Sequence, residues 1–192
     1  YDRLMRKVHA ALKGKQVDTV MFVWMQGERD AKARHGDVYA ASLKGLIDQL
    51  AADLGREDVK FVIGRLSDYD MDNRKCPHWT MVREAQVQVA EADKRGAWVD
   101  TDDLNGPKNG LHYTRDGYKT LGARFAAKAV ALVKAVGNHR SARPLLARLG
   151  GVDDQDVVVL VDVALQVLDA DDLAPVEMAR QGGFVHRPGF PQ

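Results

Sequence analysis

The chain lacks the features that tie a protein to membranes, nucleic acids or a disulfide framework. Cys76 is its one cysteine, which excludes an internal disulfide and a metal site built from several cysteines. Its longest apolar run, Val20 to Met25, is far shorter than the roughly 18 residues needed to cross a bilayer. The net charge of +1 gives no electrostatic basis for binding nucleic acid or an anionic membrane. We therefore expect a small or neutral ligand, and cysteine usage leaves the cellular compartment open.

Lysine is missing from the end of the chain. All 12 lysines lie between Lys7 and Lys134. From Ser141 onward 4 Arg face 8 Asp and Glu, a balance of −4 that leaves +5 for residues 1–140. Because breakers also cluster at 140–144 and at Gly150-Gly151, we expect one α/β domain at residues 1–140 and a separate C-terminal tail at 141–192.

The tail has three interpretations that the sequence leaves open. The run Val157 to Val161 has the composition of a strand. The same stretch also fits an amphipathic helix, with Leu160, Ala164 and Leu168 on its apolar face. The abrupt loss of lysine would equally follow from out-of-register translation of GC-rich coding sequence.

The body of the chain alternates between helical and strand-like apolar patterns. Buried strands are predicted from apolar runs at 17–25, 59–66 and 97–101. Helices are predicted from apolar stripes at 4–12, 37–54, 79–92 and 118–136. We expect Asp37 to be an N-cap, and Gly14 and Gly55 to be C-caps. After the opening helix the order is βαβαβα, which predicts a parallel sheet with right-handed crossovers and helices on both faces.

Parallel strands end at one edge of the sheet, and open sheets of this kind bind ligands there. Glu28 follows the first predicted strand, and His112 lies in the loop Asn105 to Thr114 after the third. Taken singly, each has an ordinary structural explanation, a capping turn for the acid and a solvated surface group for the histidine. Together, on one sheet edge, they indicate acid–base or nucleophilic chemistry.

At this point the residues resemble a known family. The motifs are WMQGERDA from Trp24, IGRLSDY, VREAQ, VDTDDLN and GLHYTRDGYKTLGARFA, in that order over roughly residues 1–136. They are similar to the sialate O-acetylesterase and acetylxylan esterase branch of the SGNH hydrolases. The resemblance implies a three-layer α/β/α fold, SGNH or flavodoxin-like. It also implies an enzyme that removes acetyl groups from sugars through a serine nucleophile. It implies no metal and no organic cofactor.

The resemblance also assigns roles to individual residues. His112 matches the catalytic histidine, the general base that activates the serine. Glu28 matches the glutamate of the Gln-Gly-Glu motif, a helper acid for that histidine. Gln26 stands where related hydrolases place an amide donor for the oxyanion, and Gly27 and Asn109 belong to the same oxyanion and substrate group.

Two departures from the family pattern concern catalysis. Asn109 stands three residues before His112, where the family usually carries an acid, so we expect Glu28, or failing it Asp102 or Asp103, to balance the imidazolium. The Gly-Gln-Ser-Asn type turn of the nucleophile does not occur in the chain, and its serines do not match that motif: Ser42, Ser67 and Ser141.

The simplest expectation is that the first strand and the serine turn are missing from the N-terminus, so that this chain alone is inactive. A sheet short of a strand exposes an edge, from which we expect self-association into a homo-oligomer. Two other functions stay open. One is a non-catalytic sugar-binding remnant, in which Trp24, Trp79 and Tyr113 stack on sugars. The other is a flavodoxin-like binder of a small ligand, which the lack of a Gly-rich phosphate loop argues against.

Overall fold

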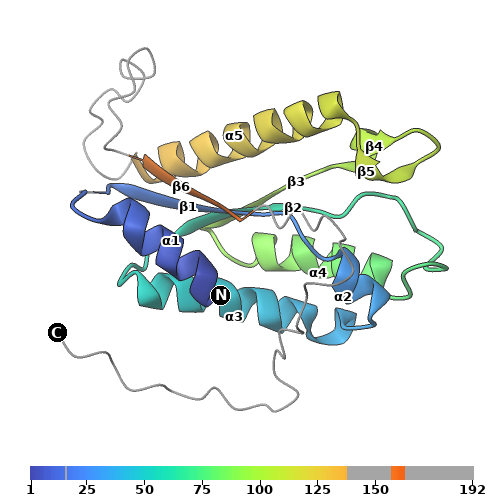
Figure 1. Cartoon of the computed structure of the whole chain (residues 1–192), viewed down its shortest axis with the longest axis horizontal. Coiled ribbons are helices and arrows are strands. Elements are labelled where there is room, and N and C mark those ends of the chain that lie inside the picture. The colour runs from blue at the N-terminus through green and yellow to red at the C-terminus, as the bar shows by residue number, and fades with distance from the viewer. Residues whose placement is uncertain (16, 138–156, 163–192) are drawn as a thin grey trace.

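A computed structural model describes residues 1–15, 17–137 and 157–162 of the chain (Figure 1). Its elements in chain order are α1 Asp2–Leu12, β1 Thr19–Trp24, α2 Glu28–Lys32, α3 Gly36–Asp53, β2 Lys60–Gly64, α4 Trp79–Glu91, β3 Gly96–Val99, the 3-10 turn η1 Asp102–Leu104, β4 Asn105–Gly106, β5 Gly110–Tyr113, α5 Arg115–Gly137 and β6 Val157–Asp162.

The main sheet is parallel, as the order of elements predicts. Its strands lie in the order β3-β2-β1-β6, and β4 pairs with β5 in a separate antiparallel hairpin. β1 pairs with β2 from Met21 opposite Lys60 to Trp24 opposite Ile63. On its other edge β1 pairs with β6, from Thr19 opposite Val157 to Trp24 opposite Asp162. The segment 157–162 is therefore a strand, and the edge of β1 that the sequence led us to expect exposed is paired.

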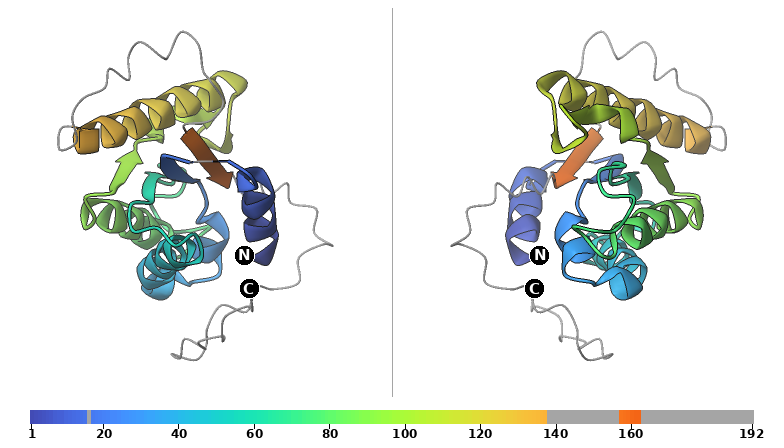
Figure 2. Two further views of the ribbon diagram at one scale, coloured as in Figure 1. Left: turned by 90° about the vertical axis from the view of Figure 1, so that its left-hand side faces the viewer. Right: turned by 90° about the vertical axis from the view of Figure 1, so that its right-hand side faces the viewer.

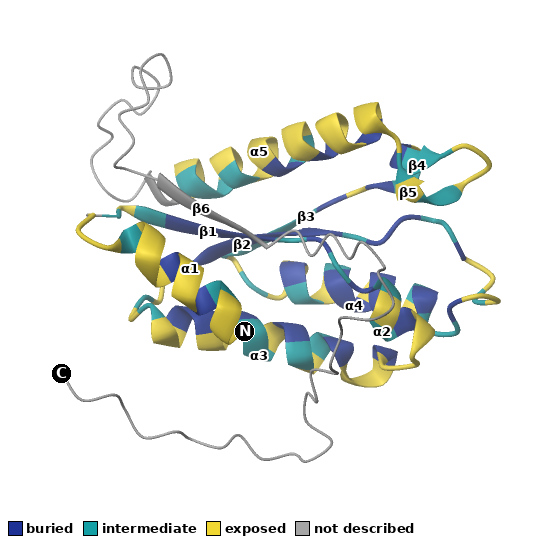
Figure 3. Ribbon diagram, viewed as in Figure 1, coloured by how far each residue is buried: buried dark blue, intermediate teal, exposed yellow. Residues whose placement is uncertain are grey.

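Helices cover both faces of this sheet and produce the three-layer arrangement. α5 lies on one face, and α1, α3 and α4 lie on the other (Figures 1 and 2). The core is therefore two apolar layers on either side of the strands, and buried residues face inward from α3, α4 and α5 (Figure 3). Among the described helices none combines the length and apolar character needed to cross a bilayer.

The strands and helices follow from their apolar patterns. All five residues of β2 are buried, which explains why its sequence is a continuous run rather than an alternating one. α3 buries Tyr39, Leu43, Ile47 and Leu50, spaced three or four residues apart. Gly55 follows this helix with φ +61.

The end of α3 is closed by two backbone hydrogen bonds of the Schellman type. They run from Gly55 N–H to the Ala52 carbonyl and from Arg56 N–H to the Ala51 carbonyl. The predicted C-cap role of Gly55 is confirmed. The predicted N-cap role of Asp37 is wrong, because α3 starts at Gly36 and Asp37 lies in its first turn.

The sequence did not reveal α2 or the β4–β5 hairpin. α2 has five residues and β4 has two, so neither is long enough to display a periodicity. The expected loop 105–114 is in fact this hairpin, and His112 lies on β5. The domain boundary expected at residue 140, the breakers at 140–144 and 150–151, and Ser141 lie outside the described residues.

Candidate functional site

The turn after β1 carries Gln26, Gly27 and Glu28, and only glycine fits at its centre. Gly27 has φ +148, a conformation that side chains rarely adopt. A Cβ built there would lie 2.8 Å from Val82 Cγ1 and 3.1 Å from Gln86 Nε2. The backbone of the turn is therefore packed directly against α4, and this close approach fixes where Glu28 begins the short helix α2.

Gln86, on α4, joins the ends of two strands. Its Oε1 accepts a hydrogen bond from the Leu66 N–H at 2.7 Å, just beyond β2. Its Nε2 donates to the Gln26 carbonyl at 2.7 Å, just beyond β1. The hydroxyl of Tyr39 donates to the same carbonyl at 2.7 Å and accepts from Trp24 Nε1 at 3.1 Å. Because Gln86 is fully buried, these bonds form in a low dielectric and hold the two strand ends in register.

Glu28 and His112 both lie at this edge despite their separation in sequence. Burial raises the pKa of the Glu28 carboxyl above its usual range. The N–H groups of Glu28 and Gly27 oppose that shift in the pKa, and so does the positive charge of His112, which is close enough to act on the carboxyl. The pair consists of a half-buried acid and an exposed histidine, the arrangement in which an acid can balance an imidazolium charge.

Asn109 lies on the hairpin with His112 but makes its hydrogen bonds elsewhere. Its Nδ2 donates to the Asp68 carbonyl at 3.2 Å, in the loop after β2. Its Oδ1 accepts a hydrogen bond from the side-chain amide of Asn105. Among the described residues the structure gives no hydrogen bond between Asn109 and His112.

The other two acids considered as partners of the histidine are held by arginines. Asp102 accepts from Arg83 at 2.7 and 3.1 Å and from Arg65 at 2.8 Å. Asp103 accepts from Arg124 at 2.6 Å on each carboxylate oxygen. The hydrogen bond from Arg124 is the largest of the influences that hold the pKa of Asp103 below its usual range. Both carboxylates are hydrogen-bonded to arginines, whereas His112 lowers the pKa of the Glu28 carboxyl.

The amide of Gln26 points to a neighbour on its own turn. Its Nε2 donates to Asp30 Oδ2 at 2.6 Å. Asp30 Oδ1 lies 3.7 Å from His35 Nδ1. An amide nitrogen carries two protons, so this bond leaves Gln26 one further proton for a ligand oxygen.

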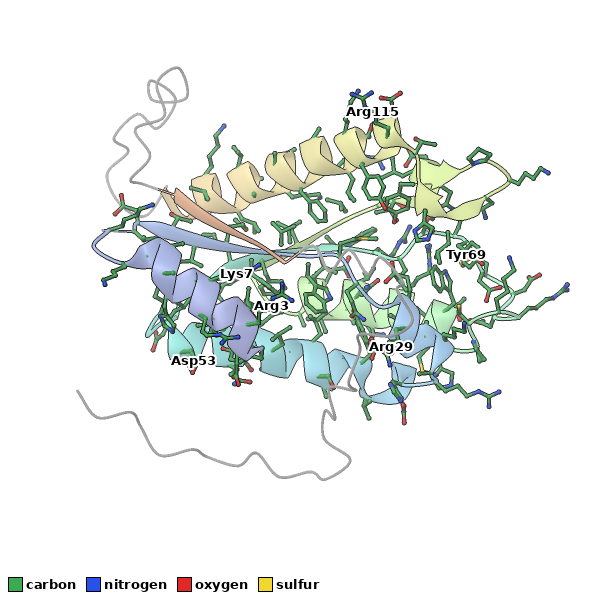
Figure 4. All side chains as sticks on the ribbon, viewed as in Figure 1. Arg3, Lys7, Arg29, Asp53, Tyr69 and Arg115 are labelled. Carbon is green, nitrogen blue, oxygen red and sulfur yellow. The ribbon has the colours of Figure 1, made fainter. Side chains whose placement is uncertain are left out.

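Figure 4 shows Arg29, Tyr69 and Arg115 at the end of the molecule where β1, β2 and β3 finish. Arg29 belongs to α2, Tyr69 to the loop after β2, and Arg115 is the first residue of α5. The Nζ of Lys75 lies 4.5 Å from the centre of the Tyr69 ring. Arg29, Tyr69 and Arg115 thus lie at the same end of the molecule as the turn that carries Glu28.

The aromatic residues considered for sugar stacking differ in exposure. Trp79 is fully buried, and its Nε1 donates to the Ser67 carbonyl at 2.7 Å, so the hypothesis of sugar stacking is wrong for this ring. Trp24 and Tyr113 are half-buried. Tyr113 packs against Tyr118 with ring centroids 5.4 Å apart.

The described residues include two serines, one of which is buried while the other lies inside a helix. Ser67 follows β2 at the right edge but is 2% exposed. Ser42 is half-buried within α3. Within the described part of the chain no group of three or more His, Cys, Asp and Glu is arranged to hold a metal ion.

Sequence reasoning missed the buried polar residues that support the site. Arg83 and Gln86 are both buried on α4, and Arg83 also donates to the Leu66 carbonyl. They flank the apolar positions Val82 and Ala85 within the motif VREAQ. Two polar residues inside an apolar helical stripe are the signal that could have revealed them, since buried polar groups need partners.

Comparisons with known proteins agree with this fold. The family model described as carbohydrate esterase, sialic acid-specific acetylesterase, matches residues 1–131. A protein of Arabidopsis thaliana solved by X-ray crystallography is similar, with 24% identity and a TM-score of 0.57. That match covers 68% of this chain and 52% of the plant chain, so the chain spans about half the length of this relative. No match was found among curated proteins.

Proposed function

The chain belongs to the carbohydrate esterase family of sialic acid-specific acetylesterases, and from this premise we propose that it provides the acid–base half of a sugar O-acetylesterase site. In this proposal His112 is the general base and Glu28 is its helper acid. The substrate is an acetylated carbohydrate, and the reaction is hydrolysis of the acetyl ester.

The observation that carries the proposal is the placement of Glu28 directly after β1 and of His112 on the hairpin after β3, with the histidine near enough to lower the pKa of the Glu28 carboxyl. These residues stand 84 positions apart in the sequence (112 − 28), yet the histidine acts on the pKa of the Glu28 carboxyl. Glu28 lies within the turn fixed by Gly27 and Gln86, while His112 is carried by the β4–β5 hairpin. Acid–base catalysis requires an acid and a base at one site, and here each is held by a different part of the fold at one sheet edge.

Each residue then has a step in the reaction. His112 takes the proton from a serine hydroxyl as the oxygen attacks the acetyl carbonyl, and gives a proton to the sugar oxygen as its bond to the acetyl carbon breaks. It then takes a proton from the water that attacks the acetyl-serine, and acetate leaves as the serine hydroxyl is restored. Glu28 stabilises the imidazolium that forms each time His112 takes a proton. The free amide proton of Gln26 stabilises the negative oxygen of the tetrahedral intermediate, where one such donor contributes about 2.7–4 kcal/mol.

The proposal includes no nucleophile from this chain. The family's Gly-Gln-Ser-Asn type turn does not occur in its sequence, and Ser67 is enclosed in the core. We accordingly propose that the 192-residue chain alone does not turn over an acetyl ester.

NMR titration of the His112 Cε1–H resonance tests the pair in the chain as it exists. Glu28→Gln removes a carboxylate near the imidazole, so the titration midpoint of His112 should fall. Asp103→Asn is the matched control, because this carboxylate lies near the same edge but is held by Arg124, and it should leave the midpoint unchanged. An unchanged midpoint in Glu28→Gln would refute the pairing.

Asn109 favours one second candidate, a sugar-binding protein without catalysis. The family usually has an acid at this position. A site that no longer catalyses a reaction would tolerate an amide there. The two candidates differ in one measurement. If Glu28→Gln leaves the His112 titration unchanged while the chain binds an immobilised acetylated sugar, the binding function is the better description.

A further inference from the structure

We propose that Asn109 is a positioning residue: its side chain fastens the hairpin that carries His112 to the loop after β2, and Asp68 in that loop selects an amide over an acid at position 109. This inference rests on the proposed function for its catalytic meaning, since it concerns how His112 is held. It assigns Asn109 a role other than the acid that usually occupies this position in the family.

A small network of three side chains joins the hairpin to the loop. Asn105, on β4, donates from Nδ2 to Asp68 Oδ1 at 2.7 Å and to Asn109 Oδ1. Asn109 donates from its own Nδ2 to the Asp68 carbonyl. The hairpin therefore has two contacts to one residue, Asp68, and the amide of Asn105 connects them.

The backbone of the hairpin turn explains why asparagine suits position 109. Lys108 and Asn109 have φ +59 and φ +55, in the left-handed region. Asparagine enters that region more readily than most residues with a side chain. Position 109 thus needs a residue that accepts this conformation and also donates a hydrogen bond, a combination that glycine and alanine do not supply.

The hydrogen bonds around position 109 argue against an acid there. Asp68 presents a carbonyl oxygen to the Asn109 amide, and its carboxylate accepts from Asn105. Lys108, the neighbouring cation on the turn, would offset part of a negative charge at position 109, so the case against an acid rests on the hydrogen bonds to Asp68. An aspartate at 109 would lose the donor to the Asp68 carbonyl, and its carboxylate would share one amide donor with the carboxylate of Asp68.

In this proposal, two different residues orient the histidine and balance its charge. Asn109 orients the strand that bears His112 through the hairpin backbone, and Glu28 supplies the negative charge. The histidine therefore does not need a carboxylate three residues before it.

Hydrogen exchange separates the side-chain contact from the backbone conformation. Asn109→Gly keeps the left-handed backbone accessible but removes the amide, so exchange of the hairpin amides 105–113 should accelerate about three- to tenfold, the effect of losing the hydrogen bond that ties the hairpin to the Asp68 carbonyl. Lys108→Gly is the matched control, because it relaxes the same turn without touching the network, and it should not accelerate this exchange. Unchanged exchange in Asn109→Gly, with β1 and β2 equally protected, would overturn the proposal.

A pair of charge variants tests the role of Asp68. Asn109→Asp should destabilise the protein at pH 8 and much less at pH 4. The reason is that a carboxyl beside Asp68 holds its proton more tightly in the folded state, and stability is lost as pH rises through that folded pKa. Adding Asp68→Asn should recover at least half of the loss at pH 8, since it removes the second charge but retains an acceptor for Asn105. A stabilising Asn109→Asp, or no recovery in the double variant, would overturn the proposal.

The two proposals fail separately. If the exchange and charge-variant results are as expected but Glu28→Gln leaves the His112 titration unchanged, the hairpin anchor stands and the catalytic pair does not. If Asn109→Asp instead raises the titration midpoint of His112 at no cost in stability, position 109 contacts the imidazole as an acid would, and the positioning role is wrong.

Discussion

Gln86 donates from Nε2 to the backbone carbonyl of Gln26 at 2.7 Å, so that a residue in the middle of α4 fixes the turn carrying the candidate acid. The contact is made to the backbone of Gln26, which leaves its side chain to Asp30 and to a ligand. Positioning and chemistry at this turn therefore depend on different groups, and they can be tested separately.

Replacing Gln86 by leucine should cost about 1–3 kcal/mol in the free energy of unfolding, measured by urea denaturation. The change keeps the volume nearly constant but leaves the buried Leu66 N–H without its acceptor. Gln88→Leu, at an exposed position of the same helix, is the control and should change stability by less than about 0.5 kcal/mol. Equal effects of the two substitutions would contradict the bridging role of Gln86.

Gly27→Ala should destabilise the chain by at least about 2 kcal/mol, because it combines an unfavourable backbone conformation with a clash. The added Cβ would lie 2.8 Å from Val82 Cγ1. The matched control is Gly122→Ala within α5, where the Cβ meets no atom within 4 Å and should raise stability by about 0.5–1 kcal/mol. Thermal unfolding of both variants measures the contrast, and a neutral Gly27→Ala would show that the turn relaxes.

The stability of the chain should respond to pH through Glu28. Burial raises the folded-state pKa of this carboxyl above its ordinary value of 4.5, so its contribution to stability is greatest at low pH and is lost as pH rises through the folded pKa. Glu28→Gln removes this dependence. The melting temperature of the variant minus that of the parent should therefore increase between pH 4 and pH 7, and a constant difference would contradict a raised pKa.

Asp102→Asn should cost about 2–4 kcal/mol, because it leaves the buried Arg83 guanidinium without its carboxylate. Asp103→Asn breaks an ion pair whose side chains are 33% and 64% exposed, and it should cost less than about 1 kcal/mol. Urea denaturation compares the two. A small effect at Asp102 would mean that water replaces the carboxylate around Arg83.

The 192-residue chain should hydrolyse an activated acetyl ester no faster than buffer and should resist a serine-directed phosphonate. The structural reason is that Ser67, at the edge of the sheet near the candidate site, is 2% exposed. Mass spectrometry after phosphonate treatment checks the second part. Specific labelling of Ser67 would relocate the nucleophile and overturn the assignment.

The sequence by itself determined the layer structure, and it predicted the sheet edge at which the candidate site residues lie. Apolar runs at β1, β2 and β3 and apolar stripes at α3, α4 and α5 repeat with different periods, and such periods are local properties of the chain. Because parallel strands share a carboxyl edge, the sequence also placed Gln26, Glu28 and His112 at one end of the sheet.

Only the tertiary structure decided which groups contact one another there. The network from Asn105 to Asp68 and the bridge from Gln86 to Gln26 join residues 37 and 60 positions apart, and no local pattern encodes such pairs. The strand at Val157–Asp162 was equally undetermined, since a short apolar run fits a strand or a helix until a neighbouring edge supplies its hydrogen bonds. Backbone pairing and side-chain orientation depend on partners brought close by folding, and that is why the direction in which Asn109 points could not be read from its position before His112.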